Sequence, residues 1–298
     1  MKLVSFTQRK KAHIGVLTDG GATVVNLSVA APKLPTDMTD IIAAAPGILP
    51  ALEKAAATRK KEARLKASRV KLIAPIPVPR RNVLCVGKNY YDHAHEFDKS
   101  GFNATADASA VPDCPIIFTK APSSVIGPGE DIPGHLDPTK SVDYEVELAV
   151  VIGKGGRKIS KKDALKHVFG YTIVNDVTAR HLQSQHKQWF LGKSIDGFCP
   201  MGPWLVTADE VGQVKKLFVE SRINGEVRQR AQVKDLIFDI PTLIATLSRS
   251  MTLQPGDIIA TGTPAGVGIG FKPPKFLKKG DVCTLAIDGL GVLENTVA

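Results

Sequence analysis

The chain has 298 residues, 43% of them hydrophobic and 23% charged, a composition typical of a globular protein with one large domain and a small one. No segment is long and apolar enough to cross a membrane, and the N-terminus lacks the apolar core of a secretion signal. We therefore expect a cytoplasmic protein without a membrane partner, with a formal charge of +10 and four widely spaced, reduced cysteines.

The first 75 residues predict a small α+β unit. Short apolar runs separated by turn residues predict strands at 3–6, 14–17 and 23–27, with a hairpin-type turn at 19–21. Two helices are expected next, at 38–45 and 51–67, the second rich in Ala, Lys, Arg and Glu. Three prolines, Pro75, Pro77 and Pro79, then form a stiff connector. We place the domain boundary there, with a cap domain at 1–75 and a larger domain at 80–298.

The basic excess lies in this first part. Residues 1–81 hold 15 Lys/Arg and 5 Asp/Glu, whereas residues 82–298 hold 24 of each. One interpretation is a binding module at residues 51–71 for nucleic acid, with the larger domain a silent scaffold. The segment has no interleaved aromatic residues and no nucleic-acid-binding motif, which favours the solvated face of a helix. We therefore expect no nucleic-acid partner.

The larger domain is expected to be rich in β-strands. Its apolar runs are short and bounded by Gly and Pro, as at 83–86, 116–118, 171–174 and 258–260. Residues 97–111 show no periodicity and predict a mobile surface loop. The glycine-rich residues 266–270 lack the strand–turn–helix context and the trailing acid of a nucleotide loop, so they predict a structural turn.

A strict alternation of apolar and acidic residues occupies positions 142–148. On a β-strand this alternation would place Asp143, Glu145 and Glu147 on one face. Clustered carboxylates repel one another unless a hard divalent cation binds them. The apolar run that follows, 148–153, puts these acids at the mouth of a core. The pattern favours a metal site over a solvated acidic face.

Further polar motifs accompany this strand in chain order. They are GKNYYDHAHE at 87–96, NDVTARHLQ at 175–183, LGKS at 191–194 and GDIIATGTPAGVG at 256–268. If the second motif is helical from Asp176, then Asp176, Arg180 and Gln183 share one face. No second histidine follows His95-Glu96 at zinc-peptidase spacing, and no Gly-x-Ser-x-Gly is present.

Taken together and in this order, these motifs resemble the fumarylacetoacetate hydrolase family. The resemblance is closest to the type called fumarylacetoacetate hydrolase domain-containing 2. The resemblance covers about residues 80–298, and QWFLGK at 188–193 and FLKKGD at 276–281 strengthen it. It implies an α+β, β-rich fold, a mixed β-sandwich roll with the pocket at one mouth and a small N-terminal α+β domain. Homodimers are usual in this family.

The resemblance also implies roles for individual residues. Glu145, Glu147 and Asp176 match carboxylates that bind one Mg²⁺ or Mn²⁺ per chain, while Asp143 lies outside that triad. The resemblance makes His93 and Glu96 a water-activating dyad and Lys193 a further catalytic residue. The matched contacts to substrate are Arg180, Gln183 and Thr263. A spacing of three lets Glu96 orient His93 on one helical turn, whereas His95 points to the surface.

From these roles we expect a metal-dependent enzyme that acts on a small anionic 2-oxo acid, most directly by hydrolysing a carbon–carbon bond of an acylpyruvate. Water activated by His93 would attack the distal carbonyl, and pyruvate would leave as a metal-stabilised enolate. Two alternatives use the same enolate: decarboxylation or keto–enol tautomerisation of oxaloacetate, and isomerisation of a hydroxymuconate-type diacid.

Overall fold

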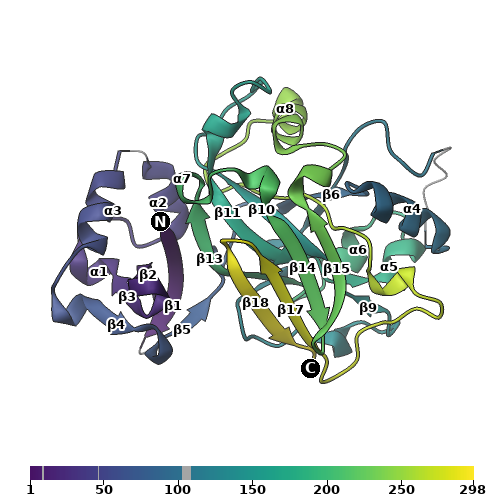
Figure 1. Ribbon diagram of the computed structural model, residues 1–298, viewed down its shortest axis with the longest axis horizontal. Helices are drawn as coiled ribbons and strands as arrows, with labels where there is room; N and C mark the ends of the chain where they lie inside the picture. The colour runs from purple at the N-terminus through teal and green to yellow at the C-terminus, as the bar shows by residue number, and fades with distance from the viewer. Residues whose placement is uncertain (9, 46, 103–108) are drawn as a thin grey trace.

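The computed structural model describes residues 1–8, 10–45, 47–102 and 109–298. The chain forms an α+β, β-rich fold, as the sequence predicts. A small N-terminal part lies beside a larger part built around two packed sheets (Figure 1). Among the described residues, no helix has both the length and the apolarity needed to cross a membrane.

The N-terminal part is an antiparallel meander covered by short helices. Its elements are β1 (Lys2–Gln8), β2 (Lys11–Thr18), β3 (Thr23–Asn26), α1 (Leu27–Ala30), α2 (Met38–Ala44) and α3 (Leu49–Ala56). Because side chains alternate along β1, Leu3 packs in one apolar cluster with Ile41 of α2, whereas Phe6 packs in another with Val24. The Asp37 carboxylate begins α2 by accepting hydrogen bonds from the amides of Thr39 and Asp40.

The predicted helix at 51–67 is wrong beyond Ala56. Helix α3 ends at Ala56, and Arg64–Lys66 forms the edge strand β4, paired with β3. In a helix Lys60 and Arg64 would be like charges four residues apart. In the edge strand Leu65 instead packs beside Phe6 and Val24, and Arg64 pairs with Asp19 at 2.5 Å. The basic segment is therefore not one continuous helix face.

One large sheet runs through both parts of the molecule. Its order is β4-β3-β2-β1-β13-β11-β10-β16-β6-β7, with β5 paired to β1 and β8 to β13. The pairing of β1 with β13, in which Leu3 faces Leu205, continues the meander into the larger part. The remaining strands of this sheet are β5 (Lys71–Ile73), β6 (Val83–Gly87), β7 (Ile116–Lys120), β8 (Val125–Ile126), β10 (Val146–Ile152), β11 (Val168–Asn175), β13 (Cys199–Thr207) and β16 (Ile258–Ala260).

A second, four-stranded sheet packs on β10 and β11. Its order is β15-β14-β17-β18, and its strands are β14 (Phe218–Ile223), β15 (Glu226–Gln232), β17 (Val282–Ile287) and β18 (Gly291–Thr296). Val150 and Tyr171 of the large sheet share a buried cluster with Val219 and Leu285 of the small one. Two further helices, α7 (Ala208–Val211) and α8 (Ile240–Ser250), lie at one end of this sandwich (Figure 1).

The short elements around the predicted site lie on the side away from the N-terminal part (Figure 1). They are α4 (Tyr91–Lys99), β9 (Val142–Asp143), β12 (Thr178–Ala179), α5 (Arg180–Gln185) and α6 (Phe190–Lys193). The loop predicted at 97–111 begins later than expected, because Phe97 belongs to α4 and is buried against Trp189. Residues 103–108 of that loop lie outside the described residues.

A close backbone approach at Gly170 should be sensitive to substitution. A Cβ atom at Gly170 would lie 2.2 Å from the Val206 carbonyl oxygen, on the β13 strand that β11 pairs with. Gly170→Ala should therefore lower the free energy of unfolding by about 1–3 kcal/mol in urea denaturation. Gly47→Ala, where the added atom would lie 3.4 Å from the Ala44 carbonyl oxygen, is the control. Equal stability of the two variants would contradict this reading of the β11–β13 contact.

Candidate active site

Three buried carboxylates converge where β10 begins and β11 ends. Ligand oxygens of Glu145, Glu147 and Asp176 lie within 4.8 Å of one another, and each side chain is buried. The pairing of Val146 with Asn175 brings the two chain segments together, and the Asp176 amide donates to the Glu145 carbonyl at 2.9 Å. The structure thus brings together the three residues that the sequence proposes as metal ligands.

Three buried cations surround two of these carboxylates. Lys193 Nζ lies 2.9 Å from Glu145 Oε2 and 2.7 Å from Asp176 Oδ2. Arg180 Nη2 lies 2.7 Å from Glu145 Oε1. Lys120 Nζ donates to Asp176 Oδ1 at 2.7 Å, and the sequence analysis missed this residue. A lysine at the end of the apolar strand β7, where a solvated side chain is not expected, is the signal that could have found it.

The electrostatic surroundings of the two glutamates differ. Burial alone would raise the pKa of Glu145, but the charges of Lys193 and Arg180 lower it from 4.5 to about 2. Burial, together with the negative charges of Asp176 and Glu145, raises the pKa of Glu147 well above its usual value. Among the described residues no Lys or Arg forms an ion pair with Glu147, and the Gly262 amide donates to its Oε2 at 2.8 Å.

This donor set fits a hard divalent cation. Mg²⁺ and Mn²⁺ prefer clustered carboxylate oxygens, which the triad supplies, and Glu147 is the triad member that forms no ion pair with a described Lys or Arg. Four buried carboxylates, Asp143, Glu145, Glu147 and Asp176, share this region with four buried cations, Lys88, Lys120, Arg180 and Lys193. A divalent cation would give the cluster a net positive charge, which suits an anionic ligand.

Asp143 does not share a strand face with the triad, so that part of the alternation argument is wrong. Strand β9 ends at Asp143 and β10 begins at Val146, so the chain leaves strand geometry between them. Asp143 Oδ2 accepts from Arg180 Nε at 2.9 Å, and its two oxygens accept from the amides of Gly268 and Ile269 at 2.7 and 3.1 Å. Asp143 therefore fixes Arg180 and the glycine-rich turn, which lies 125 residues away in sequence.

The helix predicted from Asp176 begins only at Arg180, because Thr178 and Ala179 pair with β9. Arg180 and Gln183 nevertheless share the first turn of α5, and Arg180 Nη1 donates to Gln183 Oε1 at 3.2 Å. A Cβ atom at Gly192 would lie 2.6 Å from the Gln183 amide nitrogen. This close packing of α6 on α5 brings Lys193 to the carboxylates.

His93 and Glu96 pair on one turn of α4. His93 Nδ1 lies 3.1 Å from Glu96 Oε2, and Glu96 Oε1 accepts from the Gly266 amide at 2.9 Å. With Nδ1 engaged, Nε2 is the ring nitrogen left to exchange a proton. A Cβ atom at Gly270 would lie 1.9 Å from Glu96 Oε1, so the turn must be glycine there. His95 is exposed, as expected.

A small cavity of about 20 Å³ joins these groups, with room for roughly one water molecule. Its polar lining is Lys88, His93, Glu145, Glu147, Arg180, Gln183, Lys193 and Thr263, and the aromatic side chains of Phe97, Phe118 and Trp189 close it. The Trp189 ring centroid lies 5.2 Å from that of Phe118 and 6.0 Å from that of Phe97. Thr263 lines the cavity, but its hydroxyl donates to the Val146 carbonyl at 3.0 Å.

Comparison with known proteins identifies related sequences. The family model "Fumarylacetoacetate (FAA) hydrolase C-terminal" matches residues 82–298. Oxaloacetate tautomerase YisK of Bacillus subtilis is 55% identical over 230 residues, covering 77% of this chain and 74% of that protein. The mitochondrial oxaloacetate tautomerase FAHD2A of Homo sapiens is 42% identical over 302 residues, covering 100% of this chain and 91% of that protein.

Solved structures of similar proteins have the same fold as this chain. A fumarylacetoacetate hydrolase from Exiguobacterium antarcticum has a TM-score of 0.82 and 44% identity, covering 100% of this chain and 99% of that one. A maleylpyruvate hydrolase from Sphingobium sp. SYK-6, in complex with manganese(II) and pyruvate, has a TM-score of 0.79 and 31% identity with the same coverage.

The expectation of acylpyruvate hydrolysis is wrong. The relatives with 55% and 42% identity are named oxaloacetate tautomerases, which favours the tautomerase alternative. The physical reason for the error is that hydrolysis and tautomerisation pass through the same metal-bound enolate. A carboxylate triad with a histidine therefore cannot distinguish them.

Metal binding should depend on pH through Glu147. A carboxyl group whose pKa is raised by folding stabilises the protein below its unfolded pKa, and that contribution is lost as pH rises through the folded pKa. Since a cation binds the deprotonated form, Mn²⁺ should stabilise the protein more at about pH 8 than at about pH 5.5. Thermal unfolding with and without Mn²⁺ measures this, with about 2.7 kcal/mol expected at a hundredfold excess over Kd.

The matched controls are Glu147→Gln and Asp163→Asn. Glu147→Gln keeps the shape of the triad but removes one charge, so both the Mn²⁺ stabilisation and its pH dependence should shrink. Asp163 pairs with Lys166 at the surface, 2.8 Å away, and Asp163→Asn should respond to Mn²⁺ as the wild type does. Equal stabilisation of wild type and Glu147→Gln by Mn²⁺ would refute the triad as the binding site.

Proposed function

The chain belongs to the fumarylacetoacetate hydrolase family, and we propose that it is a divalent-metal-dependent oxaloacetate tautomerase. The observation that carries this proposal is the 42% identity to a named oxaloacetate tautomerase along 100% of this chain. The active-site geometry supports it, because two carboxylates of the triad, three basic side chains and a carboxylate-oriented histidine line one small cavity.

Each group has a role in moving one proton. Bound to Glu145, Glu147 and Asp176, Mg²⁺ or Mn²⁺ would act as a Lewis acid toward the 2-oxo acid group. Arg180 and Lys193 offer positive charge and donors to the substrate's oxygens. In the keto-to-enol direction His93 Nε2 takes a proton from C3, and the imidazolium then gives that proton to the C2 oxygen, which leaves the ring neutral again. Glu96 holds the ring in place and stabilises the imidazolium that forms.

This reaction needs neither a water molecule nor a broken carbon–carbon bond. Aromatic side chains wall the cavity and keep bulk water from it, which suits proton transfer within a bound substrate. A Cβ atom at Gly87 would lie 2.3 Å from the Trp189 ring, so the indole rests directly on that backbone. This wall favours four-carbon oxaloacetate over the longer hydroxymuconate-type diacid.

The substrate assay should separate the candidate reactions. With Mn²⁺ bound, the wild-type enzyme should speed the decay of enol-oxaloacetate absorbance without releasing pyruvate and carbon dioxide, and should leave acetylpyruvate intact. Release of pyruvate from oxaloacetate at the same rate would instead identify a decarboxylase. The expected homodimer and the lack of a nucleic-acid partner stay predictions, which light scattering and a gel shift would test.

His93 should be the proton carrier. His93→Ala should lower the tautomerisation rate by about 10²–10⁴-fold, the usual contribution of a positioned general base. His95→Ala, an exposed change on the same helix, is the matched control and should keep the wild-type rate. Both rates come from the enol absorbance assay with Mn²⁺ bound. A His93→Ala enzyme with an unchanged rate would remove this role.

Trp189 should set the length of the accepted substrate. Trp189→Ala should raise kcat/KM for a hydroxymuconate-type diacid relative to oxaloacetate by about tenfold or more, because the enlarged cavity admits extra carbon atoms. Phe190→Ala is the control, since Phe190 is the next residue but is 43% exposed. An unchanged ratio in Trp189→Ala, with oxaloacetate turnover retained, would show that another part of the site limits substrate length.

A further inference from the structure

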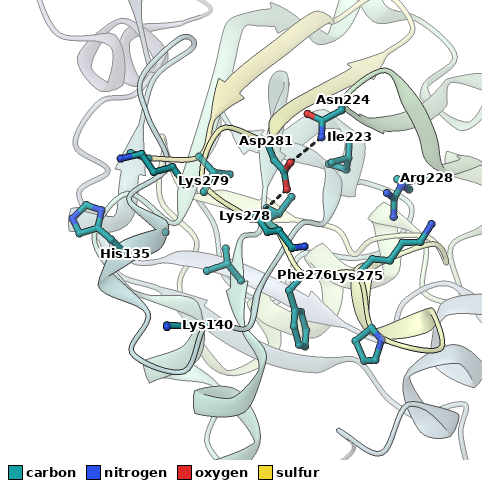
Figure 2. A pocket seen from close by; sticks show the side chains of 16 residues that line it. His135, Lys140, Ile223, Asn224, Arg228, Lys275, Phe276, Lys278, Lys279 and Asp281 are labelled. Atoms are coloured by element: carbon teal, nitrogen blue, oxygen red, sulfur yellow. Dashed lines mark hydrogen bonds between the residues drawn. The ribbon is translucent and has the colours of Figure 1, made fainter.

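A second pocket lies apart from the active-site cavity and shares no lining residue with it. Its volume is about 900 Å³, in the range of small-molecule sites. Figure 2 shows it between the strap at residues 274–279 and the end of the four-stranded sheet. The strap is held in place because the Lys275 amide donates to the Gly268 carbonyl and the Leu277 amide donates to the Val142 carbonyl, at 2.9 and 2.7 Å. None of the predicted catalytic or metal-binding residues lines this pocket.

The pocket has an apolar floor and a basic rim. Four buried side chains supply apolar lining: Val142, Ile223, Leu277 and Val297. The rim carries an excess of basic groups, namely His135, Lys140, Arg228, Lys275, Lys278 and Lys279 (Figure 2).

The carboxylates at this pocket do not balance those charges. Asp281 lines the pocket, but its oxygens already accept from the Lys278 amide at 2.7 Å and from Asn224 Nδ2 at 2.8 Å (Figure 2). Among the described residues no other acidic side chain lines the pocket, so its basic side chains outnumber its acidic ones and give it a net positive charge.

Arg228 is the most buried of these basic side chains. Its side chain is 11% exposed, and its Nε and Nη1 have no hydrogen-bond partner among the described residues. The guanidinium and the Lys275 ammonium both lie over the Phe271 ring, 5.0 and 4.5 Å from its centroid. They share one carboxylate, Glu226, at 3.0 and 3.6 Å. Two cations held this close with one carboxylate between them leave a positive charge that an anion would offset.

We propose that this pocket binds an organic polyanion with an apolar body. The anionic groups, phosphate or carboxylate, would pair with Arg228, Lys275 and Lys278 on one wall and with Lys140 and Lys279 across the pocket. The body would lie on the apolar floor beside Phe276. Cations on two walls favour a ligand with at least two anionic groups over a single small ion. This site is separate from the metal triad and does not rest on the tautomerase function.

Isothermal titration calorimetry tests the proposal with adenosine 3′,5′-bisphosphate as the probe. Two comparison arms use simpler ligands: orthophosphate, which has an anionic group but no apolar body, and adenosine, which has the apolar body but no anionic group. At physiological ionic strength, about 0.15 M, exposed charges are largely screened, so a loose basic patch should not show saturable binding. The wild-type protein should bind the bisphosphate at one site per chain and at least tenfold more tightly than either arm.

Variants decide where the probe binds. The double variant Lys275→Gln/Lys278→Gln should weaken binding at least tenfold, whereas the control pair Lys161→Gln/Lys162→Gln, exposed and outside the pocket, should not. Glu147→Gln should bind the probe as tightly as the wild type, because it alters the metal triad alone. The proposal is overturned by three results: absence of saturable binding, equal weakening by both double variants, or loss of binding in Glu147→Gln.

Discussion

The active site depends on a balance of buried charge. Leaving a buried charge unpaired costs several kcal/mol, so each ionised group in the core needs a partner of opposite sign. Lys193 bridges Glu145 and Asp176, and Arg180 joins Glu145 to Asp143. Glu147 forms no ion pair with a Lys or Arg of the described residues. A divalent ion on the triad would pair with Glu147 and add the positive charge that a dianionic 2-oxo acid requires.

The glycine-rich turn at 266–270 connects the charged groups of the active site to the rest of the fold. Its amides donate to Glu96 and to Asp143, so one turn positions both the proton-transfer pair and the carboxylate that holds Arg180. Side chains at Gly268 or Gly270 would collide with those same carboxylates. The turn follows β16, next to β10 in the large sheet, and the sheet order therefore sets the distance between His93 and the triad.

The sequence contained part of this arrangement. Local spacing was sufficient to place His93 beside Glu96 and Arg180 beside Gln183, because contacts three residues apart depend only on helix geometry. Lys120 could not be placed, since its contact with Asp176 arises from strands far apart in the chain. The reaction was missed for a chemical reason: hydrolysis and tautomerisation use the same enolate, and only the related proteins separated them.

A crystal structure with Mn²⁺ and oxalate, a stable analogue of the enolate, tests the central claim most directly. The account predicts one anomalous peak bound by Glu145, Glu147 and Asp176, with oxalate chelating the ion on the side that faces His93. It also predicts that Lys193 or Arg180 contacts an oxalate oxygen. An ion bound elsewhere, with Lys193 still bridging Glu145 and Asp176 and no metal at the triad, would contradict the account.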